Sequence, residues 1–284
     1  MNASMFKKFF LGTLLLITLV PAARIHAAPC TISGGAVNFP TGSSCEYEPN
    51  TYSITLYQLG LCTSAPVAPT PTAAANLASC TTTYNNPSGL AISVSSTGAP
   101  VALTGGTITI PPGGTYTHGY AIISNTIGIA TSVTFTSSRN GQVSGSGAVC
   151  WTANLNQTVF SGSNSTSECG SSAGSVGTIN LTVDTFDLGA LTYNQTRSVV
   201  GTNDLNVYIL EPSGVSFANG TARSGVANRI LGIQAFASPV TIAAQGAEFC
   251  DVAFKSSTGL TIIDAGGGAV KFSGGPFAVK VTAK

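Results

Sequence analysis

The sequence has 284 residues, of which 43% are hydrophobic and 7% are charged, with a formal net charge of +1. An average soluble domain has about 25% charged residues, and disordered chains combine high net charge with little hydrophobic material, so this composition indicates a folded protein with an uncharged surface. Nucleic-acid binding is excluded, because neutralising phosphates requires clusters of Lys and Arg that the chain lacks.

The first 27 residues have the three parts of a secretory signal peptide. Two lysines give a positive start, residues 9–20 form an apolar run, and Ala27 is a small residue at the expected cleavage point. The run is shorter than the roughly 20 apolar residues of a spanning helix, and Pro21 interrupts it. We therefore expect cleavage after Ala27, no transmembrane span in the remaining chain, and a periplasmic or extracellular location.

All seven cysteines follow this segment, and an oxidising compartment favours disulfides. Spacing does not fix the connectivity, but pairing of nearest neighbours gives Cys30–Cys45, Cys62–Cys80 and Cys150–Cys169. Cys250 is then left over, either as a buried free thiol or as one half of an intermolecular bond. The absence of a C-x-x-C pair and the single histidine after the signal segment lead us to expect no metal and no cofactor.

Period-two alternation of apolar and polar residues, which is typical of half-buried strands, recurs along the chain, whereas helical periodicity is hard to find. The strand candidates in chain order are residues 52–59, 90–94, 107–110, 116–124, 133–136, 179–183, 205–209, 230–236, 249–254, 260–263 and 277–281. Turn sequences separate them, such as Pro-Pro-Gly-Gly at 111–114 and Asn-Gly at 140–141 and 219–220. The sequence therefore predicts an all-β, disulfide-stapled fold that resembles an antiparallel β-sandwich or jelly roll.

Two stretches are predicted to be loops rather than strands. Residues 64–75 are rich in Pro and Ala and lie between the second pair of cysteines, whose bond would tie the loop at its base. Residues 137–177 are rich in Gly, Ser and Asn, and a boundary between lobes falls most naturally near their end. The chain after the signal segment is then either two β lobes, 28–175 and 176–284, or one large sandwich.

Aromatic residues supply the candidates for a ligand patch. Tyr116, His118 and Tyr120 alternate along one predicted strand and would share a face, and Trp151 follows Cys150 in a polar stretch. Exposed rings of this kind stack on sugars, but such side chains also pack in the interior or over a disulfide. No nucleophile motif accompanies His118, so we expect no catalytic residue.

Export, strand patterning, disulfides and low charge together favour a secreted or cell-surface structural or interaction protein without catalytic activity. A surface-layer, filament or appendage subunit, or an adhesin, would fit this description. Such a protein would associate with itself or with other surface proteins. The alternative is a secreted β-sandwich module that binds carbohydrate or another small ligand. The patch residues would then form its binding platform.

Overall fold

The computed structural model of the chain describes residues 28–94, 101–159, 166–186, 191–197, 205–244, 250–275 and 278–283. These residues form 21 β-strands and no α-helix, so the predicted all-β class is confirmed. Within these ranges there is no helix long and apolar enough to cross a membrane. The expected signal segment, residues 1–27, lies outside the described residues.

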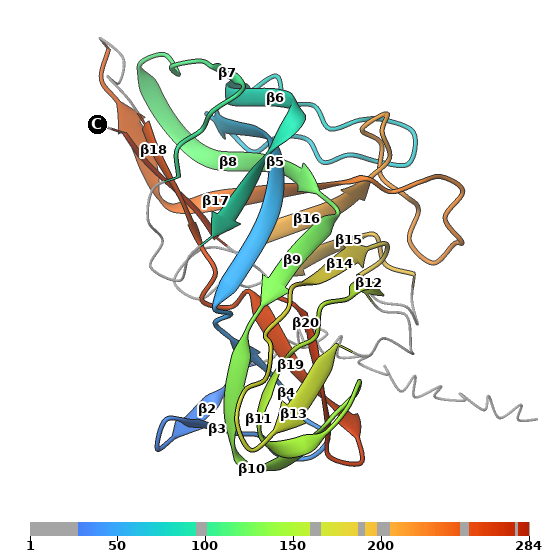
Figure 1. The fold of residues 1–284 in the computed structure, drawn as a ribbon. Coiled ribbons are helices and arrows are strands. Elements are labelled where there is room, and N and C mark those ends of the chain that lie inside the picture. Colours follow the sequence, from blue (N-terminus) through green and yellow to red (C-terminus); the bar gives the residue numbers. More distant parts are fainter. Residues whose placement is uncertain are drawn as a thin grey trace, which may run out of the picture.

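The larger sheet fills the upper part of the molecule in Figure 1. Its ten strands are β5 (Thr51–Cys62), β6 (Cys80–Val94), β7 (Thr107–Ile108), β8 (Gly114–Ser124), β9 (Thr126–Ala130), β12 (Asn156–Val159), β14 (Ile179–Val183), β15 (Asn194–Arg197), β16 (Leu205–Leu210) and β17 (Arg229–Ile242). They are ordered β12-β14-β9-β5-β8-β17-β16-β15, with β6 paired to β5 and β7 paired to β6.

The second sheet lies in the lower part of Figure 1. Its nine strands are β1 (Ala28–Pro29), β2 (Thr31–Ser33), β3 (Ala36–Asn38), β4 (Ser44–Tyr47), β10 (Ser132–Gly141), β11 (Ser146–Thr152), β13 (Ser167–Gly170), β19 (Leu260–Gly266) and β20 (Ala269–Gly274). Their order is β1-β4-β19-β20-β10-β11-β13, and the β2–β3 hairpin joins at β10. A separate pair is formed by β18 (Cys250–Lys255) and β21 (Ala278–Ala283). Strand pairing is antiparallel apart from β1–β4, β3–β10, β10–β20 and β12–β14.

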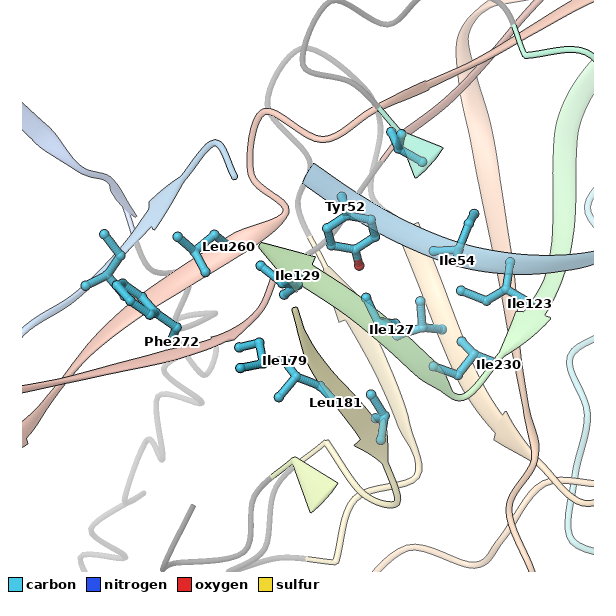
Figure 2. Close-up of a cluster of buried hydrophobic side chains, with 14 of the residues drawn as sticks. Tyr52, Ile54, Ile123, Ile127, Ile129, Ile179, Leu181, Ile230, Leu260 and Phe272 are labelled. Atoms are coloured by element: carbon cyan, nitrogen blue, oxygen red, sulfur yellow. The ribbon is translucent and has the colours of Figure 1, made fainter. Parts of the chain in front are cut away.

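One hydrophobic core takes side chains from both sheets, which makes the fold sandwich-like. Figure 2 shows Tyr52, Ile129 and Ile179 of the larger sheet beside Leu260 and Phe272 of the smaller one. All five are fully buried, and the Tyr52 hydroxyl also donates a hydrogen bond of 3.2 Å to the carbonyl of Gly275. Burial of apolar side chains on both layers is the main source of stability in such an arrangement.

Two chain segments cross from one sheet to the other at the same point. β4 leads into β5 and β9 leads into β10, and Asn50 lies at this crossing. Its Oδ1 accepts hydrogen bonds from the Thr131 hydroxyl, at 3.1 Å, and from the Ser132 backbone N–H, at 2.9 Å. The two crossings are therefore held against each other by one side chain.

The predicted boundary near residue 175 does not divide the sheets. β19 and β20 lie between β4 and β10 in the smaller sheet, and β16 and β17 follow β8 in the larger one. Each sheet thus combines strands from 28–175 with strands from 176–284. Periodicity along a sequence identifies strands but carries no information on which strands pair across long separations.

The stretch 137–177 was expected to be loop, and this prediction is wrong. β10 continues to Gly141, and β11, β12 and β13 all lie inside the stretch. Gly, Ser and Asn have low strand propensity, but the register β10–β11–β13 gives their backbone groups ladder partners, and the pair Cys150↔Cys169 lies within it. Cross-strand pairing overrides local propensity here.

Candidate functional site

The aromatic patch lies on β8, but its two tyrosines are interior residues. Tyr116 and Tyr120 are only 2% and 3% exposed, and they pack in different hydrophobic clusters. The Tyr116 hydroxyl donates to the carbonyl of Pro112 at 2.7 Å, and the Tyr120 hydroxyl lies 2.7 Å from Oγ1 of Thr82. Burial raises the pKa of Tyr120, and the hydrogen bond with Thr82 opposes that shift. Neither ring is therefore exposed at the surface of the molecule.

His118 is half-buried between its strand neighbours Cys62 and Ala235. Its Nδ1 lies 2.8 Å from Oγ1 of Thr117, and that hydroxyl also donates to the carbonyl of Thr63 at 3.1 Å. The Thr117 hydroxyl thus lies between the His118 ring and a backbone carbonyl, and the imidazole tautomer sets the direction of its hydrogen bond with His118.

Trp151 is 8% exposed and lies on β11, directly opposite Glu168 on β13. Its indole Nε1 donates a hydrogen bond of 3.0 Å to Oε2 of Glu168. The ring is also covered by backbone, since a Cβ atom added at Gly174 would lie 2.6 Å from Trp151 Cζ2. Trp151 is therefore not an exposed stacking platform, and its rung of the β11–β13 ladder is next to that of Cys150 and Cys169.

Three disulfides join the cysteines that are nearest neighbours in sequence: Cys30–Cys45, Cys62–Cys80 and Cys150–Cys169. The second one ties the Pro/Ala-rich loop at its base, where β5 ends and β6 begins, as the sequence predicts. Cys250 begins β18, but its side chain lies outside the described residues, so the alternatives for its thiol stay open. Disulfides are compatible with a protein outside the cytoplasm.

A hollow that the sequence analysis missed lies on one face of the larger sheet. Cross-strand neighbours share a face, and four adjacent strands align two rows of them. One row contains Leu59, Ala121, Gly232 and Val207, and the next contains Leu61, Gly119, Gln234 and Leu205. Large side chains lie at the two ends of each row, and the small residues Gly119, Ala121 and Gly232 lie in the middle of the rows. The result is an apolar trough with about 630 Å³ of empty space, open solvent at its mouth included.

The chemistry of this trough is simple. Its lining is aliphatic apart from Thr83, Gln234 and the rings of Tyr120 and Phe236. Thr83 already donates its hydroxyl to the carbonyl of Leu59 at 3.3 Å. The lining residues include no Asp, Glu, His, Lys or Arg, so the trough can accept an apolar group.

Charged groups elsewhere do not converge on a centre in the described part of the chain. No group of three or more His, Cys, Asp and Glu side chains there could hold a metal ion. Asp184 pairs with Arg223 at 3.0 Å, and Arg223 lies over the ring of Phe217, so this pair fastens a loop to the core. Glu46 is buried whereas Glu48 is exposed, so they do not act as a pair.

No family model, no curated protein and no solved structure matches this chain. Its function is therefore inferred from its own geometry. One signal in the sequence could have pointed to the trough. Isolated glycines inside strand patterns, such as Gly119 and Gly232, mark places where side-chain volume is missing from a sheet face.

Proposed function

We propose that this chain is an exported, non-catalytic structural or interaction protein of the cell exterior. A subunit of a surface layer, filament or appendage, or an adhesin, fits the proposal. The disulfide-stapled β-fold supports it, because small bridged β-proteins are typical of oxidising compartments. Among the described side chains, no group of His, Cys, Asp and Glu could hold a metal ion, which also fits the proposal.

One observation carries the proposal furthest. No Asp, Glu, Lys or Arg occurs from Pro49 to Ser138, a stretch that forms β5 to β9 and most of β10. Soluble monomers usually keep apart through like-charge repulsion and protect sheet edges with charged side chains. About a third of the chain has neither safeguard. A surface of this kind favours contact with other copies or with neighbouring surface proteins.

The proposal is tested on the secreted protein and on cell-surface material. Electron microscopy and size-exclusion chromatography should show large assemblies that contain this chain. A protein that stays strictly monomeric up to millimolar concentration, and that is absent from surface assemblies, would remove the proposal.

The trough favours a second candidate, a module that binds a small apolar ligand. Its mostly aliphatic lining suits a hydrocarbon better than a sugar. The probe is N-phenyl-1-naphthylamine, whose fluorescence rises in apolar sites. Ala121→Leu fills the floor of the trough and should abolish the signal, while Ala91→Leu on the exposed side of β6 should keep it. Equal fluorescence from both variants would exclude the trough as the binding site of the probe.

A further inference from the structure

Two sheet edges at opposite ends of the molecule are open. In the part of the chain that the structure describes, β7 pairs only with β6, and β2 pairs only with β3. Figure 1 places β7 at the top of the larger sheet and β2 at the bottom of the smaller one. Both edges carry large exposed apolar side chains: Ile108 is 62% exposed, Ile110 is 55% exposed and Ile32 is 53% exposed. Exposed, uncovered edges of this kind are templates for strand pairing.

Hydrogen-bond geometry decides which backbone groups of β7 are available. The Thr109 N–H donates to the Thr83 carbonyl of β6 at 2.9 Å. Successive residues of a strand direct their backbone groups to opposite sides, so the N–H and C=O of Ile108 and Ile110 point away from β6. The residues that can bond to a new strand are therefore the two isoleucines.

The same geometry holds for β2. Gly34 and Gly35 form a two-residue turn with positive φ, and Ser33 pairs with Ala36 across it. The pair that closes a two-residue hairpin exchanges backbone hydrogen bonds, which directs the backbone groups of Ile32 outward. The outward residue of this edge is again an isoleucine.

In a junction between these two edges, the side chains match as well as the backbone groups. Residues that exchange hydrogen bonds in an antiparallel pair lie directly opposite each other on one face. Any antiparallel register that joins the outward groups of β2 to those of β7 therefore places Ile32 opposite Ile108 or Ile110. No charged residue occurs from Ala28 to Cys45 or from Pro49 to Ser138, so neither edge repels the other.

We infer that copies of this chain associate head to tail, with β7 of one copy adding to β2 of the next. The inference rests on the proposed structural role and names its partner, a second copy of the chain. A head-to-tail contact that does not close on itself generates a linear assembly, whereas a two-fold contact stops at a dimer. Opposite placement of the two edges suits the linear form. The junction also joins the larger sheet of one copy to the smaller sheet of the next.

The junction is short, because β7 has two residues and is soon followed by Pro111 and Pro112, and β2 has three residues. A contact of this size lies below the roughly 1,000 Å² expected of a stable independent interface. The assemblies should therefore lengthen steadily with protein concentration and shorten on dilution.

The test uses sedimentation of the secreted protein and of three variants. Ile108→Lys blocks the β7 edge, Ile32→Lys blocks the β2 edge, and Val226→Lys adds the same charge at a 72% exposed loop position. The unchanged protein and Val226→Lys should form species larger than a dimer. Each edge variant alone should lose association by about ten-fold or more, because a charge on an edge opposes pairing. An equimolar mixture of the two edge variants should form a dimer and stop there, since one intact edge remains on each.

Each other outcome contradicts the inference in a recognisable way. A dimer that persists in Ile32→Lys and disappears in Ile108→Lys would indicate a two-fold β7–β7 contact. Large assemblies that survive in both edge variants would refute this junction and leave the proposed structural role intact. A monomeric unchanged protein would refute both. If a lysine variant fails to fold, Ile108→Pro takes its place, because it removes an outward N–H and leaves the Thr109 bond to β6 in place.

Discussion

Trp151 and Glu168 face each other across β11 and β13, one position from the disulfide that joins the same two strands. The indole Nε1 donates to Glu168 Oε2 at 3.0 Å, and the pair Cys150↔Cys169 is the adjacent rung of the ladder. A covalent bond and a charge-assisted hydrogen bond therefore fix one hairpin-like unit at the end of the smaller sheet.

This pair can be followed directly, because Trp151 is the sole tryptophan of the chain. Glu168→Ala should lower the free energy of unfolding by about 1–2 kcal/mol, since the nearly buried indole N–H loses a charged acceptor. Tryptophan fluorescence during urea unfolding measures this change. Glu48→Ala removes an exposed carboxylate and should leave the unfolding curve unaltered. An equal loss in both variants would mean that the hydrogen bond contributes nothing specific.

The three disulfides predict a defined pattern of thiol reactivity. Six of the seven cysteines are bridged, so alkylation of the unfolded, unreduced protein should add a single label, at Cys250. After reduction the protein should carry seven labels. Intact-mass measurement distinguishes these states and also tests whether the chain is cleaved after Ala27. No label together with a doubled mass would instead show an intermolecular bond through Cys250.

Burial of Tyr120 predicts a loss of stability at alkaline pH. Its pKa is raised in the folded protein, so above about pH 10 the unfolded chain releases this proton before the folded chain does. The contribution of Tyr120 is complete below that pH and falls as the pH rises through the raised folded pKa. Urea unfolding from pH 8 to 11 should show a steeper decline for the unchanged protein than for Tyr120→Phe. If the two proteins lost stability in parallel, burial of Tyr120 would not be the cause of the decline. Burial also raises the pKa of Tyr208, and this residue contributes equally to the unchanged protein and to Tyr120→Phe.

Gly60 should tolerate no side chain. A Cβ atom there would lie 2.2 Å from Cε1 of Tyr120 and 2.8 Å from the carbonyl oxygen of Thr81. Gly60→Ala should therefore lower the free energy of unfolding by about 1–3 kcal/mol or more, as overpacking does. Gly114→Ala is the matched control, because its Cβ would meet nothing within 4 Å and its φ is not positive. Thermal unfolding should show a clear loss of stability for Gly60→Ala, and a much smaller loss or a gain for Gly114→Ala.

The sequence predicted those strands in which apolar and polar residues alternate, because one face of each strand is buried. Ile179, Leu181 and Val183 are buried and alternate with half-buried polar residues, as expected, and Ile92 and Val94 behave in the same way. Strands of two to four residues, such as β1 and β13, are too short for a period to show. Their formation depends on partners that are distant in sequence.

The candidate site was predicted less well for a related reason. Alternation placed Tyr116, His118 and Tyr120 on one strand, but whether a face is covered depends on what packs against it. Predicting the trough would require the register of the strands, because Gly119, Ala121 and Gly232 become neighbours only when β8 and β17 pair. Spacing along one strand cannot show that small residues of different strands coincide.

The insertion of β19 and β20 between β4 and β10 has a consequence for how the protein is made. The centre of the smaller sheet is missing until residue 274 has been synthesised, so a nascent chain holds its N-terminal strands without their eventual neighbours. Pairing across such separations is slow compared with local folding. The smaller sheet can therefore close only after residues 260–274, near the end of the chain, have been made.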